Sequence, residues 1–212
     1  MQPSPSPNGF RDDYVKANTP FLGKWLWVLF WLVIPGEIGS LLSEELFSSA
    51  LHLPTIVGSV ISMLTEIVYG IILLKFTMFN RNFRLSGICY IAAAVSGFVF
   101  LFFPGEGGST ASLWLTLPTM ILSLIGVCHE YTGYSQLLAD IQNPLSSKWE
   151  KLWKAYAITL IIGVASMLLA FIPILGLIAI LAVMVATLVI SILKLVYLYK
   201  TAQIFRHSIF VQ

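Results

Sequence analysis

One apolar block, residues 152–199, constrains this chain more than any other feature of its sequence. A single membrane crossing needs about 20 apolar residues at a rise of about 1.5 Å each, and the block is more than twice that long. Residues 171–176, FIPILG, supply the proline and glycine for a turn. The block therefore predicts two antiparallel membrane helices, one ending near Ile172 and the next starting near Ile174.

The rest of the chain predicts four more crossings. Hydrophobic residues make up 58% of the sequence and charged residues only 10%, against roughly a quarter charged in soluble domains. Too little polar surface is left to cover a soluble globule, and a net charge of +2 does not favour nucleic acid as a partner. The four further apolar stretches cover residues 20–42, 55–79, 84–103 and 112–138.

The predicted fold class is therefore all-α: a polytopic membrane bundle of six transmembrane helices, arranged as three consecutive hairpins. We expect the bundle to cover residues 20–201. Residues 1–19 are rich in Pro, Ser, Asn and Asp and are predicted to be a disordered cytoplasmic tail. Residues 202–212 are predicted to be a second, short cytoplasmic tail.

The basic residues predict the orientation of this bundle. With six crossings and a cytoplasmic N-terminus, the outer loops fall near residues 43–54, 104–112 and 173–176, and none of the twelve Lys and Arg residues lies in them. Basic residues favour the cytoplasmic side, so both termini are predicted there. The expected location is the cell membrane, with a bacterial-type inner membrane favoured.

A short repeat marks the predicted outer ends of the helices. PGEIGS begins at Pro35, PGEGGS begins at Pro104, and a third proline, Pro173, follows the next apolar run. We favour independent use of Pro-Gly turns over an internal duplication. At Pro35 the first helix either ends near Ile34 or continues past the proline, which would place Glu37 within the outer leaflet. We favour a helix end.

Glu66 is the most costly residue in the sequence, because it lies near the centre of the second predicted helix. A carboxylate at that depth is expensive unless it is paired, protonated or in contact with water. Ser62, Thr65 and Tyr69 offer hydroxyl groups at helical spacing from it. Two interpretations stay open: a proton or cation site in a polar pocket, or a structural acid that fixes the order of the helices.

The fourth predicted helix carries a second polar group. Glu130, Tyr134 and Gln136 are candidates for the lining of a cavity on the cytoplasmic side. Lys194, in the last helix, could pair with Glu130. Its predicted depth would also let its ammonium group reach the inner surface unaided, and a three-way contact with Glu66 is not expected.

No metal site or cofactor is predicted. His129 has no His, Cys or carboxylate three or four residues away, which is the spacing that metal ligands on one helix use. Cys89 and Cys128 both lie in apolar runs and are interpreted as free thiols.

Aromatic and basic residues near the start of the fifth helix predict an anchor at the membrane–water interface. Tryptophan prefers that interface, and lysine beside it reaches lipid phosphates. The predicted anchor residues are Trp149, Trp153, Lys148 and Lys151.

The sequence contains no nucleotide-binding loop, no GxSxG and no HExxH, so an enzyme is not predicted. Our first hypothesis is a small structural or accessory membrane subunit whose partners are the lipid bilayer and a second copy or another membrane protein. The alternative is a small transporter or channel. In that alternative, Glu66 binds a proton or cation, Glu37 lies near the outer mouth and Glu130 lies near the inner exit.

Overall fold

The computed structural model describes residues 15, 17–43, 55–102, 110–139, 141–169 and 173–207. Within these ranges the chain forms six long α-helices and one short 3₁₀ turn, so the all-α prediction is confirmed. The elements are α2 (Thr19–Ser43), α4 (Thr55–Lys75), η1 (Phe76–Met78), α5 (Arg81–Phe102), α6 (Thr110–Leu138), α7 (Asn143–Leu169) and α8 (Pro173–His207).

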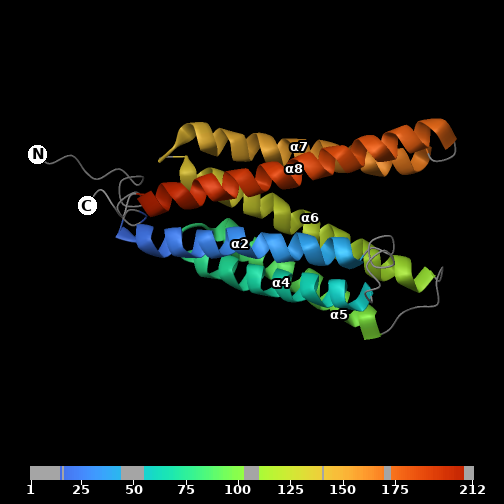
Figure 1. Ribbon diagram of the computed structural model, residues 1–212, viewed down its shortest axis with the longest axis horizontal. Helices are drawn as coiled ribbons and strands as arrows, with labels where there is room; N and C mark the ends of the chain where they lie inside the picture. The colour runs from blue at the N-terminus through green and yellow to red at the C-terminus, as the bar shows by residue number, and fades with distance from the viewer. Residues whose placement is uncertain are drawn as a thin grey trace, which may run out of the picture.

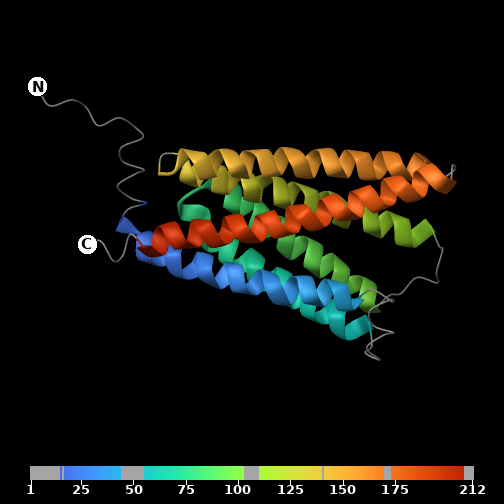
Figure 2. The same cartoon turned by 45° about the horizontal axis from the view of Figure 1, so that its top comes forward.

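The helices lie side by side along one long axis (Figure 1), and their contacts follow sequence order and close into a ring. Each helix contacts the next one along the chain, and α2 also contacts α8. Consecutive helices run antiparallel, as short connections require. The start of α2 and the end of α8 lie at the same end of the bundle, which we call the terminal end (Figure 2). The opposite end is the distal end.

Four stretches of these helices are long and apolar enough to cross a membrane. Large apolar side chains such as Trp31, Leu64 and Val185 are exposed on the outside of the ring, where lipid can cover them. The described part of the chain is therefore a membrane-embedded helical bundle. The four stretches are Thr19–Ser43, Thr55–Met78, Arg81–Val99 and Leu181–Arg206.

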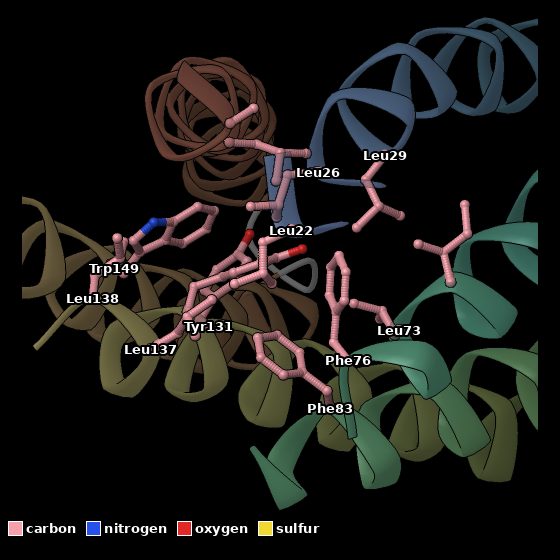
Figure 3. Close-up of a cluster of buried hydrophobic side chains, with 14 of the residues drawn as sticks. Leu22, Leu26, Leu29, Leu73, Phe76, Phe83, Tyr131, Leu137, Leu138 and Trp149 are labelled. Atoms are coloured by element: carbon pink, nitrogen blue, oxygen red, sulfur yellow. The ribbon is translucent and has the colours of Figure 1, made fainter. Parts of the chain in front are cut away.

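The packed core lies mostly in the terminal half of the ring, and Figure 3 shows part of it. Leu22 and Leu26 of α2 are fully buried there against aromatic side chains from the facing helices. The rings of Tyr134 and Trp149 have centroids 4.7 Å apart, within the range of favourable aromatic packing. This core closes the terminal end of the ring interior.

Trp149 corrects the anchor prediction. Its side chain is fully buried, and its indole Nε1 donates a hydrogen bond to Thr201 Oγ1 of α8 at 3.2 Å. The face of α7 that carries Trp149 therefore points into the core and not toward lipid headgroups. The periodicity of the sequence identifies an aromatic face, and only packing decides what covers it. Of the other anchor residues, Trp153 is half-buried, and Lys148 and Lys151 are exposed.

The first helix does not end at Ile34. Helix α2 runs through Pro35 to Ser43, so this prediction is wrong. A proline inside a helix removes one backbone hydrogen bond, and close packing against α4 holds the following turns in place. Pro173, by contrast, is the first residue of α8, a position that suits proline. The second copy of the repeat, residues 104–109, lies outside the described residues.

Glycines bring α2 and α4 unusually close together. A Cβ atom built on Gly39 would lie 2.8 Å from the backbone nitrogen of Ser62, and one on Gly58 would lie 2.7 Å from the carbonyl oxygen of Gly39. No side chain fits between these backbones, so glycine is required on both helices. The glycines of the first repeat therefore hold α2 against α4.

Helix α8 extends farther than predicted. It continues to His207, so residues 202–207, which were assigned to the tail, are helical. Ala202 and Phe205 are buried against the core, which explains why the helix does not end near Tyr199. This extra length places Lys194 deeper in the ring than its sequence position suggested.

Candidate functional site

A polar cavity of about 220 Å³ lies inside the ring, beyond the packed core. One face of α2 and one face of α4 form most of its wall, each with residues at i, i+3, i+4 and i+7 spacing. Tyr90 of α5 and Lys194 of α8 complete it. The lining from α2 is Val33, Gly36, Glu37 and Ser40, and the lining from α4 is Ser62, Thr65, Glu66 and Tyr69.

The carboxylate of Glu130 lies at the centre of the polar cluster and is fully buried. The hydroxyl of Tyr69 donates to its Oε1, and the hydroxyl of Tyr90 donates to its Oε2 at 2.6 Å. The ammonium Nζ of Lys194 also donates to Oε2, at 3.1 Å. One carboxylate on α6 is therefore bound by side chains from α4, α5 and α8.

This arrangement satisfies a charge that would otherwise be very costly to bury. Charge-assisted hydrogen bonds are stronger than neutral ones, and the three donors occupy both carboxylate oxygens of Glu130. The pairing of Glu130 with Lys194 is present, as the sequence suggested. The alternative, in which Lys194 reaches the inner surface unaided, is wrong because α8 places it inside the ring.

Two more carboxylates line the same cavity. Glu66 is half-buried and Glu37 is exposed, and neither makes a hydrogen bond or an ion pair with another described residue. Glu66 makes no direct bond to the Glu130–Lys194 pair, but it lines the same cavity as Lys194. With all groups ionised, three carboxylates therefore lie in or beside the cavity with one ammonium group.

Two predicted cavity residues lie elsewhere. Tyr134 is fully buried in the core, with its ring packed on Trp149. Gln136 is exposed on the outside of α6, because its separation of six residues from Glu130 makes about 1.7 turns and places it on a different face. Its Oε1 accepts hydrogen bonds from the amides of Asn80 and Asn82, at 2.8 and 2.9 Å.

Tyr90 is the site residue that the sequence analysis missed. Its phenol is buried and its hydroxyl binds Glu130. A signal was present, because a tyrosine near the middle of an apolar membrane helix carries a hydroxyl that needs a partner. Tyr69, by contrast, was selected because it lies at helical spacing from Glu66.

The histidine in this region makes a polar contact outside the cavity. His129 Nδ1 lies 3.1 Å from Asn82 Oδ1, at the contact between α5 and α6. Across the described ranges, no group of three or more His, Cys, Asp or Glu side chains is arranged to hold a metal ion.

Comparison with family models, curated proteins and solved structures gave no match. The fold and the site alone define the class of protein. It is a helical membrane protein with a cavity inside its ring that is lined by ionisable side chains.

Proposed function

We propose that the chain crosses the membrane six times, with both termini in the cytoplasm, and that the membrane is a plasma membrane of the bacterial inner-membrane type. Helices α6 and α7 have 29 and 27 residues, enough to cross. The basic residues of the described helices support the orientation, because all except Lys194 lie toward the terminal end. These are Lys24, Lys75, Arg81, Arg84, Lys148, Lys151, Lys154, Lys200 and Arg206.

Cysteine labelling tests this topology at the two ends of α6. We expect Thr110→Cys to react with a membrane-impermeant maleimide in intact cells, and Gln142→Cys to react only after permeabilisation. Cys89 and Cys128 are replaced by serine in both variants so that the new thiol alone reacts. Equal reactivity of the two positions in intact cells would show that α6 does not cross.

We further propose that the protein is a cation transporter or channel, and that the cavity is its binding site. The main support for this proposal is an imbalance of charge in and beside the cavity. Three carboxylates, those of Glu37, Glu66 and Glu130, lie there with one ammonium group, that of Lys194. At the depth of a membrane, charges without partners are costly and usually mark an ion or proton pathway. A bound cation or a proton would balance Glu37 and Glu66, which form no ion pair with another described residue.

A purely structural or accessory role accounts for less of this arrangement. The Glu130–Lys194 pair alone could serve to fix α6 against α8. Such a role gives no reason for Glu66 and Glu37 to line a cavity with two serines and a threonine. The flux experiment below also tests the accessory role, which a lack of current would favour.

The flux experiment uses purified protein in liposomes on a solid-supported membrane. We expect a charge movement when protons, sodium, potassium or an organic ammonium ion is added on one side, and we expect Glu66→Gln to abolish it. Glutamine keeps the shape of the side chain but cannot carry the charge. The matched control is Glu150→Gln, because Glu150 is exposed on α7, away from the cavity, and pairs with Lys154 at 2.7 Å.

Two results would contradict transport. One is a current in Glu66→Gln equal to that of the unchanged protein. The other is the absence of current for every cation in a correctly folded preparation, and it would favour the accessory role.

A further inference from the structure

The ammonium group of Lys194 is surrounded by tyrosine rings. Its Nζ lies 5.0 Å from the ring centroid of Tyr69, 5.9 Å from that of Tyr90 and 5.8 Å from that of Tyr131. The fourth side is the carboxylate of Glu130, at 3.1 Å. Aromatic faces combined with a carboxylate are how proteins recognise ammonium groups, since the negative face of the ring attracts the cation.

Two of the same rings also form the wall of the cavity. Tyr69 and Tyr90 line it together with Glu66, so a guest in the cavity meets aromatic surface and a carboxylate, as Lys194 does. The hydroxyl of Thr65 donates to the carbonyl oxygen of Ile61 at 2.8 Å. Its lone pairs therefore remain available to accept a bond from an N–H donor.

The cavity suits a small organic cation better than a metal ion. Hard metal ions need several oxygen ligands that converge, and no carboxylate-rich metal cluster is present in the described ranges. A volume of about 220 Å³ is below the roughly 300–1,000 Å³ of pockets for drug-sized ligands. The volume is several times the roughly 30 Å³ that one water molecule occupies in the liquid, so a small organic molecule can fit.

We propose that the ligand of the cavity is a small aliphatic ammonium compound with one or two amino groups. Its ammonium group binds Glu66 and packs on the rings of Tyr69 and Tyr90, beside the tethered ammonium of Lys194. A second amino group would meet Glu37 at the exposed side of the cavity. This inference rests on the proposed function, because it names the class of cation that the same site takes.

The test is direct binding to the purified full chain in lipid nanodiscs, which does not depend on transport. The probes are methylammonium, propylammonium and 1,4-diaminobutane, with sodium, potassium and magnesium chloride at equal ionic strength. Propanol is the neutral control for propylammonium. We expect saturable binding of at least one amine by calorimetry and a rise in thermal stability, with no comparable effect of propanol or the inorganic salts.

Variants locate the binding site. We expect Glu66→Gln to weaken amine binding by about tenfold or more, since the variant replaces a charge-assisted hydrogen bond by a neutral one. We expect Glu150→Gln to leave the affinity unchanged. A thermal melt of each variant without ligand confirms that it is folded.

The outcomes separate this inference from the proposed function. Inorganic cations that bind in a Glu66-dependent way, while amines do not, would overturn the inference and leave cation transport standing. Amine binding that survives Glu66→Gln would place the amine outside this cavity and would also overturn it. Amine binding that depends on Glu66 without any charge movement in liposomes would support the inference and contradict transport. If neither amines nor inorganic cations bind, the inference is wrong. Transport is then tested by the proton flux in liposomes alone.

Discussion

Replacing Lys194 by methionine is expected to destabilise the folded bundle by about 3–5 kcal/mol, because it leaves the fully buried carboxylate of Glu130 without its cation. Methionine fills most of the volume of the lysine stem, so the loss is one of charge and not of packing. The two tyrosine hydroxyls still donate to Glu130, but they carry no compensating charge. The measurement is the free energy of unfolding in a mild detergent.

A double-mutant cycle isolates the pair. Glu130→Gln alone should also be destabilising, because it leaves a buried ammonium unpaired. The double variant, Glu130→Gln with Lys194→Met, should recover much of the loss, since no buried charge is left without a partner. The amide oxygen can accept from one tyrosine hydroxyl, and the amide NH2 can donate to the hydroxyl oxygen of the other. If each single variant is as stable as the unchanged protein, the Glu130–Lys194 pair does not hold the fold.

An exposed ion pair on α7 provides the control for this cycle. Lys154 and Glu150 are 2.7 Å apart, closer than the buried pair, but their side chains are 65% and 57% exposed. Water and salt screen such a pair. We therefore expect Lys154→Met to change stability very little, even though the distance alone would suggest the opposite order.

Replacing Gly58 by alanine is expected to give the second large effect, a loss of about 3 kcal/mol, at the upper end of the usual cost of overpacking. The new Cβ would lie 2.4 Å from the backbone nitrogen of Ser43 and 2.5 Å from the carbonyl carbon of Leu42. Backbone atoms cannot rotate away as a side chain can, so α2 and α4 must separate. The wall of the cavity would open with them, and cation binding should weaken together with stability.

Gly163→Ala is the matched control on α7. Among the described side chains, a Cβ there would meet a methyl group, Cγ1 of Val183, at 3.6 Å, which is an ordinary contact. Alanine also favours a helix over glycine, so we expect stability to stay equal or to rise slightly. Thermal melts of the two variants, side by side, check the prediction. A Gly58→Ala protein as stable as Gly163→Ala would mean that α2 and α4 do not approach as closely as described.

Much of the cavity could be predicted, because charge inside an apolar helix is conspicuous in any sequence. Glu66 and Glu130 were selected on that ground, and Lys194 was selected as a possible partner of Glu130. The structure brings Glu66 and Lys194 to one cavity with Glu130 directly beside it. Tyr90 was missed because a tyrosine is compatible with several environments. Trp149 was misplaced because an amphipathic face has the same pattern whether lipid headgroups or another helix covers it.

The sequence by itself determined the solvent and the secondary structure of this protein. Apolar stretches of membrane length, with few charges, require helices, because backbone groups in lipid must bond within their own segment. Only the tertiary structure decided which side chains meet. The continuation of α2 past Pro35 depends on the glycine contact with α4, and the depth of Lys194 depends on how far α8 extends along the core. Both are set by contacts between residues far apart in sequence, which no local pattern records.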